Sequence, residues 1–216
     1  MIKYRRELLN ILERLVFDVR FIKDNSYDIV KLFVNQMGIT IFSLVLYTAV
    51  GAIEDEVLFG KISVLVSIFA TIFYLALIYT ATWDYGARDK IRIDGGKLEA
   101  VKGKGALLSL IANVPNFIIS ALAVITMLVY LGNASDVAYS AFAVANLILR
   151  FINAMFLGAL QGIFSFLKDS TDAYFLWQSV GYFVAPFITV PVAHFGYEMG
   201  IRELRIFKPT YRNEKE

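Results

Sequence analysis

Long stretches without charge alternate with short charged segments along this chain. Asp, Glu, Lys and Arg are absent from residues 32–53, 62–83, 105–135 and 173–197, and each of these runs is at least 22 residues long. About 20 apolar residues in a helix cross the hydrocarbon core of a bilayer. The pattern predicts an all-α fold, a polytopic transmembrane helical bundle with membrane segments at 32–53, 62–83, 106–131, 137–167 and 173–197.

The first 26 residues have a different pattern. Leu8, Leu12, Leu15, Val19 and Ile22 recur at helical spacing, and Arg and Glu occupy the other faces. This spacing is typical of an amphipathic N-terminal interfacial helix, here residues 1–26, lying on the cytoplasmic leaflet. The same face would equally suit packing against loops of the protein or against a partner.

Basic residues are concentrated in three segments. Seven Lys and Arg lie in residues 1–31, six in 84–104 and five in 198–216, whereas the other connections have one or none each. Because positive charge marks the cytoplasmic side, the N-terminus, an 84–104 loop and the 198–216 tail are predicted to be cytoplasmic in a multi-pass plasma-membrane protein.

The number of crossings depends on residues 137–167. If both termini are cytoplasmic, this segment must cross an even number of times or not at all. Two short arms folded at Arg150 would give six spans, which we favour, although Leu149-Arg150-Phe151 contains no turn signal. The alternative is five spans, with Pro186 and Pro191 allowing the last segment to bend or re-enter.

The 84–104 loop carries a weaker pattern. Asp94-Gly95-Gly96 lies between partly alternating apolar residues, which is a modest signal for a β-hairpin. Linkers, repeats and low-complexity tracts are absent from the sequence, so residues 1–216 are predicted to form a single membrane domain.

Composition supports the membrane class and narrows the function. Hydrophobic residues make up 58% of the chain and charged ones 19%, with a mean hydropathy of +0.61, whereas soluble domains are about 25% charged. The chain has no Cys and one His, and the five segments contain no Asp or Glu. These counts argue against an enzyme, a metal site or a cofactor. The net charge of +2 gives no reason to expect a nucleic-acid partner.

Arg150 is the only charged residue between Asp136 and Lys168. Asn146, Arg150 and Asn153 lie within about 60° of one helix face, with Gln161 close to it. An arginine turned towards lipid would cost at least about 2.5–3.5 kcal/mol, so this face should meet the bundle interior or water.

Three interpretations of this polar face remain open. It forms a site for a small polar or anionic solute, it holds helices together through hydrogen bonds, or Arg150 marks a cytoplasmic boundary. The polar residues of the third segment could complete a solute site, whereas the stripe in the second segment is expected to make packing contacts. The predicted solute-binding residues are Arg150, Asn146, Asn153, Gln161, Asn113 and Asn116, and the packing stripe is Ser63, Ser67, Thr71 and Tyr74.

Three stretches, FVNQMGITIF (33–42), WDYGARDKIRID (83–94) and KGKGALLSLIANVPNF (102–117), resemble segments of small multi-span membrane proteins from low-GC Gram-positive bacteria. The resemblance covers about half of the chain and implies a bacterial membrane bundle without implying an activity. In size and span number the chain is also similar to the substrate-binding membrane components of energy-coupling-factor vitamin transporters, which is a likeness of architecture alone.

Together these patterns predict a non-enzymatic integral membrane protein. We expect it to bind or move a small polar or anionic solute as part of a transport system in the lipid bilayer. The alternative is a membrane subunit or scaffold that assembles with protein partners through its cytoplasmic helix and loop.

Overall fold

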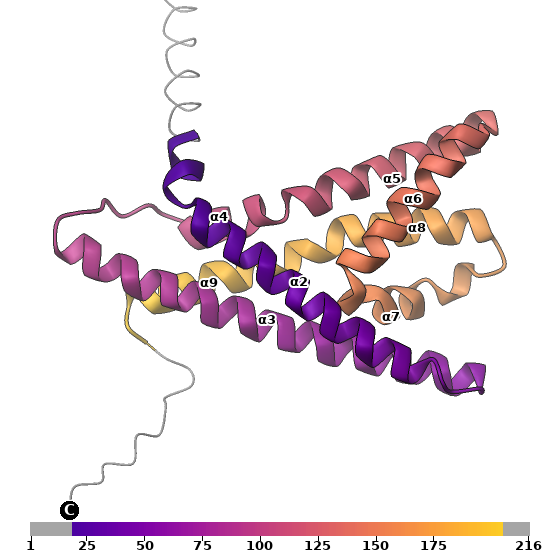
Figure 1. Ribbon diagram of the computed structural model, residues 1–216, viewed down its shortest axis with the longest axis horizontal. Coiled ribbons are helices and arrows are strands. Elements are labelled where there is room, and N and C mark those ends of the chain that lie inside the picture. Colours follow the sequence, from indigo (N-terminus) through magenta and orange to yellow (C-terminus); the bar gives the residue numbers. More distant parts are fainter. Residues whose placement is uncertain (1–18, 205–216) are drawn as a thin grey trace, which may run out of the picture.

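The computed structural model describes residues 19–204, and every regular element in this range is a helix (Figure 1). The all-α prediction is therefore confirmed for the described residues. In chain order, the elements are α2 (Ser26–Val50), α3 (Glu56–Asp94), α4 (Lys104–Ala112), α5 (Val114–Asn133), α6 (Asp136–Ile152), α7 (Ala154–Ile163), η1 (Ser165–Leu167), α8 (Thr171–Val184), η2 (Ala185–Ile188) and α9 (Thr189–Ile201).

Two of the predicted segments fall partly outside the described residues. Of the amphipathic helix predicted at 1–26, only 19–26 can be compared with the structure; 19–24 are helical, and Phe21 is buried while Ile22 is exposed. Of the predicted tail 198–216, the described part is 198–204, where α9 ends at Ile201. The interfacial helix and the tail therefore stay predictions.

Within residues 19–204, four helical segments are long and apolar enough to cross a membrane: α2, α3, α5 and the continuous stretch Thr171–Ile201 formed by α8, η2 and α9. A fifth is obtained only if α6 and α7 are counted as one span, although the two helices are bent by 112°. These lengths and compositions fit a membrane protein, but the described helices give four spans, or five with the bent pair, and do not confirm the expected five or six.

The connections between helices gather at two opposite ends of the bundle (Figure 1). Residues 19–25, 95–103 and 202–204 lie at the left end, and 51–55 and 164–170 lie at the right end with the short link from α5 to α6. The left end thus carries the described parts of the basic segments. This arrangement fits the sequence-based topology, which assigned those three segments to one side.

The polypeptide bends sharply between α6 and α7. α6 runs from the right end towards the middle of the bundle, and α7 leads the chain back towards the same end (Figure 1). The sequence-based hypothesis placed a fold at Arg150, but α6 continues through Arg150 to Ile152 and the helical path breaks at Asn153. A fold in this segment was expected; its position was wrong by three residues.

α3 continues well beyond the predicted segment 62–83. It runs for 39 residues to Asp94, so residues 84–94 are helical rather than part of a loop. The hairpin expected around Asp94-Gly95-Gly96 is wrong, because Gly95 caps the helix and Gly96 has a φ of 66°, a conformation that glycine adopts without strain.

Close packing against α9 explains why the end of α3 stays helical. Gly196 and Gly200, four residues apart on α9, lie directly against the α3 backbone. A Cβ atom on Gly200 would lie 2.1 Å from the carbonyl oxygen of Trp83, which leaves room for glycine alone. Paired small residues at this spacing let membrane helices approach closely. The contact buries Tyr85, Gly86 and Asp89 along the inner face of α3.

Candidate functional site

The carbonyl oxygen of Ile152, at the end of α6, accepts hydrogen bonds from α2. Thr40 Oγ1 donates to it at 2.7 Å and Gln36 Nε2 lies 3.5 Å away. A helix break inside an apolar bundle leaves backbone oxygens without an intrahelical donor, and each such group is costly to bury. Polar side chains of α2 therefore stabilise the break.

Hydroxyl groups of α3 donate hydrogen bonds to the first turn of α7. Met155 carbonyl oxygen accepts hydrogen bonds from Ser67 Oγ at 2.5 Å and Thr71 Oγ1 at 3.2 Å. The hydroxyl stripe on this helix was expected to make packing contacts, and this is confirmed for Ser67 and Thr71. A neighbouring glycine, Gly158, allows α7 to approach α3 closely, since a Cβ there would lie 2.1 Å from Ser63 carbonyl oxygen.

Asn153 lies at the break itself and is completely buried. Its Oδ1 accepts from Gln36 Nε2 at 3.4 Å, while Nδ2 has no hydrogen-bond partner in the described structure. The side chain of Asn153, the cap residue of α7, makes no capping hydrogen bond to the first described turn of this helix, which begins at Ala154. The positive end of the α7 dipole and a free amide group thus lie together at the break.

Arg150 lies one helical turn before the break. One terminal nitrogen, Nη2, donates to Gln178 Oε1 of α8 at 2.9 Å, and the guanidinium lies 5.6 Å from the centre of the Phe175 ring. Its Nε atom is buried without a partner within residues 19–204. α6 ends in the middle of the bundle (Figure 1), so Arg150 lies among the helices rather than at either end of the bundle.

Asn146 repeats the pattern one turn earlier on α6. It is 5% exposed, and its Nδ2 also lacks a partner among the described residues. Asn146, Arg150 and Asn153 therefore each retain a buried N–H donor that no described residue accepts from. Buried donors are normally satisfied, and leaving one unpaired costs about 1–3 kcal/mol. Such a surplus of donors around a positive charge is the chemistry that binds carboxylate or phosphate oxygens.

The other predicted site residues lie in different surroundings. Gln161 accepts a hydrogen bond from the Tyr47 hydroxyl and lines a groove near the start of α3. Asn113 lies at the break between α4 and α5, where Nδ2 donates to Thr189 Oγ1 at 3.2 Å, and Asn116 Nδ2 donates to Asn113 Oδ1 at 2.9 Å. In the described part of the chain, no hydrogen bond joins either asparagine to Arg150, so their place in a common site stays a prediction.

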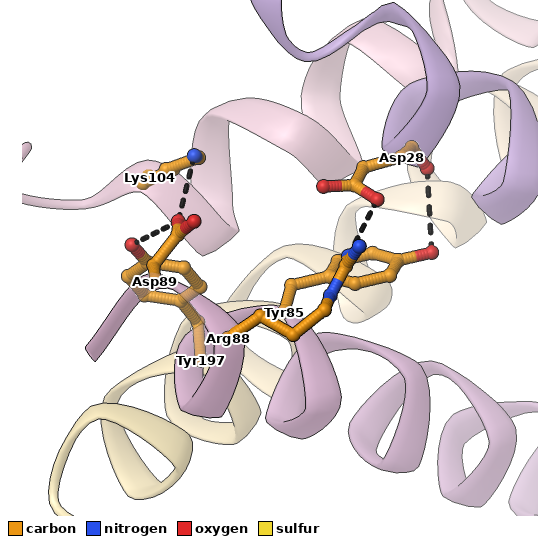
Figure 2. A network of polar contacts seen from close by, with 6 residues as sticks. All are labelled: Asp28, Tyr85, Arg88, Asp89, Lys104 and Tyr197. Atoms are coloured by element: carbon orange, nitrogen blue, oxygen red, sulfur yellow. Dashed lines mark hydrogen bonds and ion pairs between the residues drawn. The ribbon is translucent and has the colours of Figure 1, made fainter. Parts of the chain in front are cut away.

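A buried polar cluster was missed by the sequence interpretation. Lys104 Nζ lies 2.7 Å from Asp89 Oδ2, and Tyr197 donates its hydroxyl to the same oxygen at 2.8 Å (Figure 2). Next to it, Arg88 pairs with Asp28 at 2.7 Å (Figure 2). Residues 84–104 were expected to form a solvated loop, and charged loop residues do not suggest buried pairs. The helical spacing of Tyr85 and Asp89, with the GxxxG pattern of Gly196 and Gly200, could have indicated a buried helix end.

Fold and site together define an all-helical protein with several segments suited to a membrane and a polar break within the bundle. Comparisons with protein-family models, curated proteins and solved structures give no match. The function is therefore argued from the geometry of the site.

Proposed function

We propose that this chain is a non-enzymatic integral membrane protein that binds a small anionic solute at the break between α6 and α7, as part of a transport system. The observation that carries the proposal is the set of unpartnered donors at Asn146, Arg150 and Asn153, next to the uncapped N-terminus of α7. Each of these free N–H groups favours a nearby negative charge, and no described residue accepts a hydrogen bond from any of the three side-chain nitrogens.

General physics supports an anion at this position. The N-terminus of a helix carries about half a positive charge, and its free N–H groups point outward along the axis. Arginine adds a full charge and a planar fork of donors that matches carboxylate or phosphate oxygens. Interrupted helices form solute sites in many transporters, because the freed backbone groups and helix ends are available to the solute.

In the proposed topology, the hairpin of α6 and α7 does not cross the membrane. α2, α3, the α4–α5 segment and the α8–α9 segment cross, and both termini are cytoplasmic. The hairpin enters from the opposite side and returns to it, which satisfies the charge distribution without a crossing by residues 137–167. The interrupted backbone at membrane depth is acceptable here because Thr40 and Gln36 donate to the freed Ile152 carbonyl oxygen.

Native mass spectrometry of the purified full-length chain, in mild detergent, tests the proposal. We expect a bound small molecule in the wild type that is lost in Arg150→Met. Arg92→Met makes the same change at an exposed position and should retain it. Thermal unfolding of both variants establishes that they are folded. If the Arg150→Met variant does not fold, Arg150→Lys provides the second test. A folded Arg150 variant that keeps the solute would contradict the proposal.

A second candidate function is a membrane subunit that binds a protein partner at its cytoplasmic face. α3, with 39 residues, is about 58 Å long, nearly twice the thickness of the hydrocarbon core. Its final turns present Ile91, which is 72% exposed, between Lys90 and Arg92. A protein partner that is bound in fixed stoichiometry in the same mass spectrum, and is lost in Ile91→Glu, would favour this function. A chain that carries a solute but no protein partner would exclude it.

A further inference from the structure

A groove of about 840 Å³ opens between the start of α3 and the end of α7. It lies at the right-hand end of Figure 1, opposite the end with the basic segments. Its polar floor includes Gln161, whose Oε1 accepts a hydrogen bond from Tyr47 and whose Nε2 donates to no described residue. The floor therefore offers an amide donor to a bound group.

The charges around this groove differ from those of the surrounding surface. Carboxylates dominate this end of the bundle, at Glu54, Asp55, Asp136, Asp169 and Asp172, and none of these five side chains lines the groove. In the described segments 51–61, 130–139 and 163–172, the only cations are Lys61 and Lys168, and both line it. One carboxylate, Glu56, also does, so the lining carries a net positive charge.

No carboxylate in the described part of the chain neutralises either lysine. Lys61 and Lys168 form no ion pair with any carboxylate within residues 19–204. Two cations that line the same concave surface attract an anion more strongly than the same charges would on a flat surface, because low-dielectric walls focus the field. The surrounding carboxylates repel anions from the rest of this end of the bundle. The groove therefore attracts anions more than the surface around it does.

The geometry points to this groove as a second anion-binding site, which takes a compact carboxylate or phosphate group between Lys61 and Lys168 with Gln161 at its floor. The group belongs either to a soluble molecule or to the head group of an anionic lipid. The site does not depend on Arg150. If the function proposed above also holds, α7 connects the two sites, since Gln161 follows Asn153 by eight residues, about 12 Å along the helix.

The absence of Cys from the sequence allows a direct test. Ser165→Cys would introduce a single thiol into the groove lining, and Gly132→Cys a control thiol at the same end, where an added Cβ meets open space. For each full-length variant, the rates of reaction with an anionic and a cationic methanethiosulfonate of similar size are measured. Using the ratio of the two rates removes differences in thiol exposure.

We expect the anionic-to-cationic ratio at Ser165→Cys to exceed that at Gly132→Cys by about fivefold to tenfold at low salt. When Lys61→Gln and Lys168→Gln are added to the Ser165→Cys variant, the ratio of the anionic to the cationic rate should fall to the value measured for Gly132→Cys. Both lysines are exposed, so these changes should leave the fold intact, which thermal unfolding verifies. The proposal would be overturned if the thiol of Ser165→Cys did not react, or if the ratio of the two rates did not change when both lysines were replaced.

Protection of the thiol identifies the source of the anion. Inorganic phosphate that slows labelling of Ser165→Cys in uncharged detergent supports a soluble ligand, and slower labelling only in nanodiscs with phosphatidylglycerol supports a lipid head group. Protection by neither overturns the assignment of the site. Arg150→Met should leave both the ratio and the protection unchanged, so the outcome here is independent of the test at the helix break.

Discussion

Lys104 and Asp89 form a buried ion pair, with 2.7 Å between Nζ and Oδ2 and only 7% of each side chain exposed. The pair joins the start of α4 to the end of α3, and Tyr197 adds a hydrogen bond from α9. Two consecutive helices and a third one, 108 residues further along the chain at Tyr197, therefore meet at one carboxylate.

Removal of either charge should destabilise the protein strongly. Asp89→Asn or Lys104→Met leaves the other charge buried without a counter-charge, which costs about 3–5 kcal/mol of unfolding free energy. Tyr197→Phe removes only one hydrogen bond to a charged group and should cost less, about 1.5–3 kcal/mol. Reversible unfolding in mixed micelles provides the measurement. In the double variant Asp89→Asn/Lys104→Met the two losses should be far from additive, and simple additivity would contradict direct pairing.

Gly200 should tolerate no side chain. In Gly200→Ala the new methyl group would overlap the Trp83 carbonyl oxygen and force α9 away from α3, which we expect to cost about 1–3 kcal/mol. Gly38→Ala is the matched control, because nothing lies within 4 Å of the added atom and alanine favours the helix by about 0.5–1 kcal/mol. The two melting temperatures should move in opposite directions. A neutral Gly200→Ala would mean that the helices are further apart in the membrane.

Thr40 should contribute to the stability of the helix break. Thr40→Val removes the donor to Ile152 carbonyl oxygen with almost no change in shape, and we expect a loss of about 0.6–1.7 kcal/mol. Thr126→Val serves as control, since Thr126 bonds only to carbonyl groups of its own helix. Hydrogen exchange of amides 153–156 should accelerate in Thr40→Val alone. Equal exchange in the two variants would argue that α2 does not support the break.

The hairpin formed by α6 and α7 predicts which segments share a side of the membrane. Single cysteines at Gly132 and Asp169 should be labelled by an impermeant reagent from the same side, and a cysteine at Lys97 from the opposite side. If residues 137–167 crossed once instead, Gly132→Cys and Asp169→Cys would react from opposite sides. Six crossings would place Arg150→Cys within reach of the reagent from the side of Lys97, whereas the hairpin buries that position.

The helical class and the position of most helices could be predicted from the sequence, because uncharged runs of sufficient length have few alternatives in a bilayer. The break at Asn153 could not be located in the same way. Residues 149–153 contain no glycine or proline, and the break is stabilised by Thr40, Gln36 and Ser67 from other helices. Local signals do not report such distant hydrogen bonds.

The charged cluster at the end of α3 was missed for a related reason. A high density of charge is typical of a solvated loop, so Asp89 and Lys104 were assigned to one. Their burial follows from the contact between α3 and α9, which depends on Gly196 and Gly200, more than 90 residues further along the chain. Of the predicted site, Asn146, Arg150 and Asn153 proved to share unpartnered donors, whereas Gln161, Asn113 and Asn116 have other hydrogen-bond partners.

α3 is a single uninterrupted helix, about 58 Å long, that carries Lys61 near one end and Asp89 near the other. A continuous helix behaves as a stiff rod, unlike α6 and α7, which are bent by 112° at Asn153. A tilt imposed on the first turns of α3 therefore displaces its last turns as well. The same helix therefore links the two ends of the bundle as one stiff unit.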